Sequence, residues 1–233
     1  MRNIKLTITL LLITMLSSNF AFAQDWAQLN KYKAENAKLK VPAPGEKRVV
    51  FMGNSITEGW SNHHPAFFEG KPYLNRGIGG QTTPQMLVRF RQDVIDLKPE
   101  VVVILAGIND IAGNTGPSTL EMIMDNIVSM TELAKANNIK VVLSSVLPAL
   151  DFKWNPGQEP APKVVALNEM IKGYAAEKNL VYLDYFSAMA DAQQGLKQEY
   201  TYDGVHPNEA GYKVMAPLAE AAIAKALARK AKK

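Results

Sequence analysis

The residues best suited to chemistry in this sequence are a serine, an aspartate and a histidine. Ser55 ends an apolar run in the stretch FMGNSITEGW, where small neighbours would leave its hydroxyl exposed. Asp203 and His206 lie three residues apart in DGVHP, so a turn can set the carboxylate on one imidazole nitrogen and leave the other free to take a proton. Together they have the roles of nucleophile, base and orienting acid in acyl transfer.

Acyl transfer also needs hydrogen-bond donors aimed at the negative charge that develops on the carbonyl oxygen. Small and polar residues follow two further apolar runs, as GIGGQT at 77–82 and AGIND at 106–110. We predict an oxyanion hole made of the backbone N–H groups of Ser55 and Gly80 and the side-chain amide of Asn109. Any one of these clusters alone is also typical of an ordinary strand-to-helix turn.

Alternating segments predict the elements that must position these residues. Short β-branched runs predict strands at 48–52, 73–76, 101–105, 140–146 and 180–183. Apolar residues at helical spacing predict helices at 84–97, 118–137, 163–178 and 208–230. Because strands such as VVVIL at 101–105 are apolar on both faces, we expect an α/β fold, a three-layer α/β/α sandwich with a parallel sheet of about five strands. Ligands bind beyond the carboxyl ends of such strands.

Four blocks in this order resemble the SGNH, or GDSL-like, serine hydrolases. The blocks are GNS at 53–55, Gly80, GIND at 107–110 and DGVHP at 203–207. The resemblance runs from about Val49 to Gly211, nearly the whole mature domain. It implies a flavodoxin-like sheet and ester hydrolysis without a metal or an organic cofactor.

The resemblance also implies roles for single residues: Ser55 as nucleophile, His206 as base and Asp203 as its partner, with Gly80 and Asn109 as oxyanion donors. The segment from 75 through 83 and on to 109 is further similar to the catalytic subunits of platelet-activating-factor acetylhydrolase, a branch that acts on short acyl groups.

One residue departs from the family pattern, because Asn54 stands where the name motif has aspartate. That side chain is neither nucleophile nor base, so we expect altered local hydrogen bonding and an unchanged mechanism.

The N-terminus has the layout of a secretory signal, with Arg2 and Lys5, an apolar run at 6–16 and Ala-Phe-Ala at 21–23. We expect a signal peptide at 1–23, cleavage near Ala23 and export to the periplasm or the extracellular space. The apolar run is shorter than the roughly 20 residues of a membrane span, so we expect no stable membrane anchor. A lead-in at 24–46 and a single hydrolase domain at 47–233 would follow.

Composition excludes several classes of function. The chain has no cysteine, which rules out a disulfide framework, a thiol nucleophile and thiolate metal sites. Its formal net charge of +4 becomes −2 once two basic residues of the signal and four of the C-terminal tail are set aside. Because no basic stripe alternates with aromatic residues, we expect no nucleic-acid partner. The expected partner is a small-molecule or glycan ester.

Other candidate residues have ordinary explanations. His63 and His64 would lie about 12 Å along a helix beginning at Ser55, too far to bond to it directly. Asp110 either supports the third cluster or caps a turn. Three aromatic residues could stack on a sugar or acyl group but are more often packing residues, and we leave them out of the site: Trp60, Trp154 and Tyr202. The proline-rich stretch at 147–162 is a candidate for the rim of the site.

The sequence therefore predicts an exported serine esterase that hydrolyses short-chain, chiefly acetyl, esters through an acyl-enzyme. O-acetylated carbohydrates are the expected substrates, inferred from export and from the short-acyl resemblance. One alternative is a lipid-directed esterase or lysophospholipase with the same triad. Another is a non-catalytic carbohydrate-binding module built on the same sheet.

Overall fold

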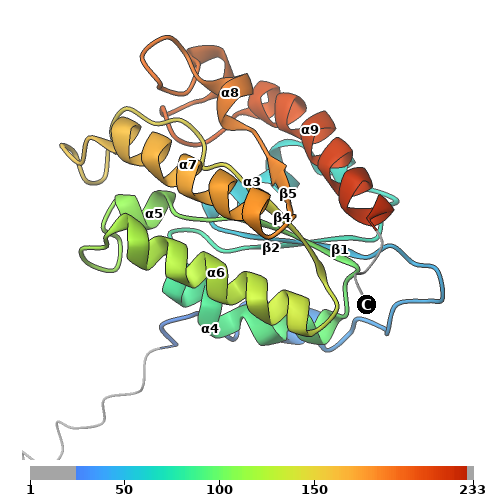
Figure 1. Ribbon diagram of the computed structural model, residues 1–233. Helices are drawn as coiled ribbons and strands as arrows, with labels where there is room; N and C mark the ends of the chain where they lie inside the picture. The colour runs from blue at the N-terminus through green and yellow to red at the C-terminus, as the bar shows by residue number, and fades with distance from the viewer. Residues whose placement is uncertain (1–24, 230–233) are drawn as a thin grey trace, which may run out of the picture.

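The computed structural model describes residues 25–229, so the expected signal peptide and its cleavage near Ala23 lie outside the described residues. At its centre is a sheet of five parallel strands in the order β2-β1-β3-β4-β5 (Figure 1). The strands are β1 (Val49–Gly53), β2 (Tyr73–Gly77), β3 (Val101–Leu105), β4 (Lys140–Ser144) and β5 (Val181–Leu183). This order is that of flavodoxin-like sheets, and it confirms the predicted fold class.

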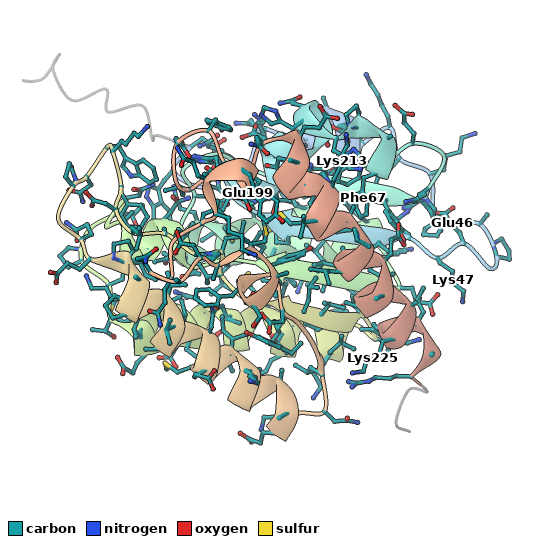
Figure 2. All side chains as sticks on the ribbon, turned by 90° about the horizontal axis from the view of Figure 1, so that it is seen from above. Glu46, Lys47, Phe67, Glu199, Lys213 and Lys225 are labelled. Atoms are coloured by element: carbon teal, nitrogen blue, oxygen red, sulfur yellow. The ribbon has the colours of Figure 1, made fainter. Side chains whose placement is uncertain are left out.

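Helices cover both faces of the sheet. They are α2 (Lys33–Asn36), α3 (Ser55–His63), α4 (Thr83–Asp93), α5 (Ile108–Ile111), α6 (Leu120–Ala136), α7 (Pro160–Glu177), α8 (Phe186–Met189) and α9 (Glu209–Ala228). Single 3-10 turns are η1 (Pro65–Phe67), η2 (Ile95–Leu97) and η3 (Gln198–Tyr200). In Figure 1, α4 and α6 lie on one side of the sheet and α9 on the other. Figure 2 looks onto the α9 layer, where Lys213 and Lys225 lie toward the two ends of that helix.

The central strands are buried as their composition predicts. Every residue of β1 and β3 is buried, and Val101 and Val102 have no exposed surface. Each such aliphatic side chain contributes roughly 1.5–3 kcal/mol when it leaves water. The predicted long helices are all present, but the one expected at 84–97 is split at Val94 into α4 and η2.

The segment expected to be a lead-in packs against the domain. Ala27 is buried, and its carbonyl accepts a hydrogen bond from Gln81 Nε2 at 2.8 Å. The Tyr32 ring lies under the guanidinium of Arg76, 4.6 Å from its centroid, and the Tyr32 hydroxyl donates to the Gly77 carbonyl. Residues 25–36 therefore belong to the folded unit at the end of β2. No helix within residues 25–229 is both long and apolar enough to cross a bilayer.

Candidate active site

Loops from four parts of the chain meet at the carboxyl ends of the strands. They are residues 53–55 after β1, 77–82 after β2, 106–110 after β3 and 201–208 before α9. In Figure 1 the loops after β3, β4 and α8 gather at the left end of the molecule, where α6 and α7 begin. The predicted site residues all lie on these loops or on the first turn after them.

The structure brings the three predicted catalytic side chains into one hydrogen-bonded chain. Ser55 Oγ lies 2.9 Å from His206 Nε2, although the two residues are 151 positions apart in sequence. His206 Nδ1 lies 2.7 Å from Asp203 Oδ2. With the proton on Nδ1 donated to the carboxylate, Nε2 is left to accept the serine proton. This arrangement can therefore turn the Ser55 hydroxyl into a nucleophile.

The first turn of α3 holds Ser55 at the end of β1. Asn54 caps the helix, since its side-chain oxygen accepts the Ile56 N–H at 3.0 Å. This is the hydrogen bond that an aspartate would also accept, so the departure from the family motif preserves the cap. A Cβ on Gly53 would collide with the Thr57 side chain, and only glycine lets α3 pack this closely against the strand.

A compact turn orients Asp203 toward His206. Thr201 Oγ1 accepts the N–H groups of Asp203 and Gly204 at 3.2 and 2.9 Å and donates to the His206 carbonyl at 2.7 Å. Asp203 Oδ1 accepts the N–H groups of Val205 and His206 at 2.9 and 2.7 Å. Partial burial raises the pKa of Asp203, but these hydrogen bonds outweigh it and hold the pKa below its usual value. The carboxylate is therefore charged where it faces the imidazole.

The predicted oxyanion donors lie on neighbouring loops. Gly80 has a φ of +74°, which a side chain would strain, and no protein acceptor within residues 25–229 takes its N–H or that of Ser55. Asn109 is buried, and its Nδ2 donates to the Gln81 carbonyl at 3.0 Å. An amide carries two N–H groups, so Asn109 can hold this loop with one and present the other to an oxyanion.

Asn114 is a site residue that the sequence analysis did not identify. Its Nδ2 donates to the Gly80 carbonyl at 3.1 Å, and its Oδ1 accepts the Trp154 Nε1–H at 3.1 Å. Asn114 thus connects the stretch at 147–162 with the loop of a predicted oxyanion donor. The sequence gives no sign of this role, because the two partners, Gly80 and Trp154, lie 34 and 40 residues away on other loops.

A buried arginine, Arg89, connects the loop after β1 with the loop after β2. Arg89 has no exposed surface, donates to the Gly53 carbonyl at 2.9 Å and to the Gln81 side chain at 2.5 Å, and pairs with buried Asp93 at 3.1 Å. Burial lowers the pKa of Arg89, and Asp93 opposes that shift. The only sign of this role in the sequence was the position of Arg89 next to Phe90, an apolar residue of a predicted helix that the structure shows to be buried.

Asp110 lies in α5, but its carboxylate caps the start of a different helix, α4. Its carboxylate accepts the Thr83 N–H at 3.0 Å and the Thr83 hydroxyl at 2.6 Å, which ties the β3 loop to the first turn of α4. Burial raises the pKa of Asp110 to about 6, against the Thr83 hydrogen bonds.

The remaining candidates divide between core and site. Trp60 is buried and stacks on Phe67 at 4.4 Å, so it is a packing residue. Tyr202 lies between the rings of His63 and His206, with centroids 5.8 and 5.9 Å away. His63 thus approaches the site through Tyr202. Within residues 25–229 no three His, Asp or Glu side chains gather closely enough to hold a metal ion.

A serine, histidine and aspartate joined at the carboxyl edge of a flavodoxin-like sheet define a hydrolase that works by acyl transfer. The chain belongs to the GDSL-like lipase/acylhydrolase family, whose model matches residues 51–214. It is a carboxylic ester hydrolase of that family.

Two solved structures from Bacteroides species are similar along nearly their whole length. An acylhydrolase from Bacteroides fragilis is 53% identical, with a TM-score of 0.86 over 88% of this chain and 99% of that one. A GDSL-like lipase from Bacteroides thetaiotaomicron is 50% identical, with a TM-score of 0.84 over 86% of this chain and 98% of that one.

Curated relatives are more distant. The esterase TesA of Pseudomonas aeruginosa is 29% identical over 70% of this chain and 77% of its own length. An acetylxylan esterase of Xylanibacter ruminicola is 26% identical over 78% of this chain and 45% of its own, and the Bacillus subtilis lipoprotein YqeF is 36% identical over 46% and 51%. The chain spans about half the length of these last two proteins.

Proposed function

We propose that this protein is an exported serine esterase that removes short acyl groups, chiefly acetyl, from O-acetylated carbohydrates. The observation that carries the esterase chemistry is the chain from Ser55 Oγ through His206 to Asp203, with separations of 2.9 and 2.7 Å. The acyl group and the alcohol are inferred from relatives and from the surroundings of the site.

In the first half of the proposed reaction, Ser55 Oγ attacks the ester carbonyl carbon while His206 Nε2 takes its proton. The carbonyl oxygen becomes an oxyanion, and the donors for it are the N–H groups of Ser55 and Gly80 and the Asn109 amide. Asp203 stabilises the imidazolium that forms. As the carbon–oxygen bond breaks, His206 returns the proton to the departing alcohol, which leaves an acyl group on Ser55.

In the second half, a water molecule repeats the sequence. His206 takes a proton from the water as its oxygen attacks the acyl carbon, and the second oxyanion uses the same donors. Collapse breaks the bond to Ser55 Oγ, which recovers its proton from His206. The products are the free acid and the original enzyme, and no other reagent is consumed.

Two findings support the finer parts of the proposal. Acetylxylan esterases of Xylanibacter ruminicola and Geobacillus stearothermophilus are 26% and 24% identical to the chain over 221 and 148 residues. For export, the support is the signal-like layout of residues 1–23 together with the similarity to a Bacillus subtilis lipoprotein.

The direct test is hydrolysis of p-nitrophenyl esters from acetate to dodecanoate by the wild type and Ser55→Ala. We expect activity that peaks at acetate and is lost in the variant. Ser129→Ala is the matched control, since this hydroxyl lies on α6 and donates to the Asp125 carbonyl of its own helix. A peak at long chains would replace the short-acyl assignment by a lipid-directed esterase. A folded Ser55→Ala protein with undiminished turnover would exclude Ser55 as the nucleophile.

Export has a separate test. The full chain is produced in a Gram-negative host, and the N-terminus of the protein in the periplasm and medium is sequenced. We expect a chain that begins at Gln24. An uncleaved chain confined to the cytoplasm would refute the export assignment without touching the esterase chemistry.

A further inference from the structure

Two exposed aromatic rings flank the imidazole of the candidate site. The Trp154 side chain lies 6.0 Å from His206 between ring centroids, and that of Tyr202 lies 5.9 Å away. The two residues are 45% and 59% exposed, although large aromatic side chains are usually covered. They come from different loops, at 147–162 and 201–204, and converge on the same residue.

Both rings are held in place before any ligand arrives. Trp154 packs on the buried ring of Phe152 at 5.0 Å, and its Nε1–H donates to Asn114. The plane of the Tyr202 ring is inclined by only 10° to that of the His206 ring. The Tyr202 ring also contacts the ring of His63, 5.8 Å away between centroids. Ordered, exposed aromatic faces lose little conformational entropy when a ligand packs on them.

The reaction fixes which part of the ester meets these rings. His206 Nε2 must hand its proton to the oxygen of the departing alcohol, so the alcohol lies against the imidazole in the transition state. The side chains beside that imidazole are Trp154 and Tyr202. In the same transition state the acyl carbon is bonded to Ser55 Oγ, and its carbonyl oxygen points toward the predicted oxyanion donors.

A cavity is lined by Lys153 and Asp203, the chain neighbours of Trp154 and Tyr202. It has a volume of about 230 Å³ and is lined by Leu150, Asp151, Lys153, Leu196, Asp203 and Gly204. Charged side chains at its wall suit a ligand that carries hydroxyl groups better than an acyl chain, which offers them no hydrogen bond. Hydroxylated rings with apolar C–H faces are sugars, and such faces pack on aromatic rings.

We propose that Trp154 and Tyr202 form an aromatic subsite that binds a sugar ring on the alcohol side of the ester. This assignment rests on the proposed function and adds to it the residues that select the alcohol. Trp154 also connects the subsite to the oxyanion loop, because Asn114 accepts its Nε1–H and holds the Gly80 carbonyl. A ring seated on Trp154 therefore steadies the side chain that positions Gly80.

The test compares a sugar ester with an ester whose alcohol is too small to stack. The ratio of kcat/KM for an acetylated methyl xyloside to kcat/KM for ethyl acetate is measured for the wild type, Trp154→Ala and Tyr202→Ala. We expect the ratio to fall about 10-fold in each variant, as for the loss of one aromatic packing partner. Tyr202→Phe, which keeps the ring, should lower it less than about 3-fold. Trp26→Ala is the matched control, because Trp26 is 47% exposed and lies on the N-terminal segment.

A binding measurement separates failure of the subsite from failure of the proposed function. Ser55→Ala protein is titrated with the acetylated methyl xyloside and contact is followed by saturation-transfer NMR. Signals from the sugar ring that vanish in Ser55→Ala/Tyr202→Ala support the subsite even if turnover is absent. An unchanged kcat/KM ratio in Trp154→Ala and Tyr202→Ala overturns the subsite. Contact with the sugar that persists in Ser55→Ala/Tyr202→Ala also overturns it. Absence of Ser55-dependent hydrolysis of either ester would refute the proposed function alone.

Discussion

At the scale of single residues, Asp203 has two tasks that its two oxygens divide between them. Oδ1 accepts backbone N–H groups of the turn, and Oδ2 accepts the His206 Nδ1–H. In Asp203→Asn the remaining oxygen keeps the backbone bonds, and the amide then faces Nδ1. Because the amide donates to Nδ1, the imidazole carries its proton on Nε2. A protonated Nε2 cannot accept the Ser55 proton. We expect kcat to fall by up to roughly 10⁴-fold, as in a comparable triad.

This prediction is checked by steady-state kinetics on p-nitrophenyl acetate. Asp184→Asn is the control, since Asp184 also caps a turn, accepting the Ser187 N–H at 2.9 Å, but lies outside the site. Because hydrogen bonds hold the pKa of Asp203 below its usual value, its protonation should not limit activity above about pH 4. A folded Asp203→Asn protein with wild-type kcat would remove Asp203 from the mechanism.

Asn114 acts through another residue, and its variants can show this. Asn114→Ala removes the donor to the Gly80 carbonyl, so the Gly80 N–H, a predicted oxyanion donor, is no longer held in its orientation. A neutral hydrogen bond contributes about 1 kcal/mol, so we expect kcat to fall about 5- to 10-fold with a nearly unchanged KM for p-nitrophenyl acetate. Asn114→Asp keeps the acceptor for Trp154 but loses the donor, and should lower kcat as much.

Asn137→Ala serves as the comparison, because Asn137 donates to the Leu133 carbonyl at the end of α6. Equal kcat in the wild type and both Asn114 variants would show that Asn114 only joins two loops.

The residues of the candidate site differ in how far sequence could predict them. Asp203 and His206 were accessible because they stand three positions apart, and Ser55 because it ends an apolar strand. Asn114 was not, and Trp154 was considered only as a possible stacking residue, since their contacts run between loops that share no periodicity. Short-range spacing reports geometry within a turn, whereas the packing of one loop on another depends on the whole fold.

At the scale of elements, α4 carries a buried ion pair on the same side of the helix as the buried residues Met86 and Phe90. Arg89→Met would leave the buried Asp93 carboxyl group with only the side-chain amides of Asn36 and Gln92 as partners, and would remove the donor to the Gln81 side chain. Removing one partner of a buried pair costs about 3–5 kcal/mol. We expect the free energy of unfolding in urea to fall by that amount.

The matched control is Arg91→Met, two residues along the same helix and exposed. Arg89→Met/Asp93→Leu should recover part of the loss, because the unpaired charge is then gone. A loss below about 1 kcal/mol in Arg89→Met would show that water or rearrangement satisfies Asp93.

The elements themselves were largely predictable from pattern. The strands follow from β-branched runs that are apolar on both faces, and their observed bounds differ from the predicted ones by at most two residues. The short helices α5 and α8 were not predicted, because four residues show no period. The packing of residues 25–36 was also unforeseen, since it depends on hydrogen bonds from side chains such as Gln81 and Gln92 to backbone carbonyls.

At the scale of the whole molecule, burial of one carboxyl group makes stability depend on pH. Asp110 joins the β3 loop to α4, and burial raises its pKa to about 6 from 3.8. Between these values the folded protein binds a proton that the unfolded chain releases. The folded state is therefore favoured most below about pH 4, and this contribution is lost as the pH rises through about 6.

The prediction concerns the difference between two proteins, so that other titrating groups cancel. In Asp110→Asn the side-chain oxygen can still accept the Thr83 N–H, but nothing titrates at this position. From pH 4 to pH 7 we expect the wild type to lose up to about 3 kcal/mol of unfolding free energy relative to the variant, since each pKa unit corresponds to about 1.4 kcal/mol. Urea unfolding at both pH values measures this double difference. A constant difference would mean that the hydrogen bonds from Thr83 offset burial, and a difference of opposite sign would mean that they exceed it.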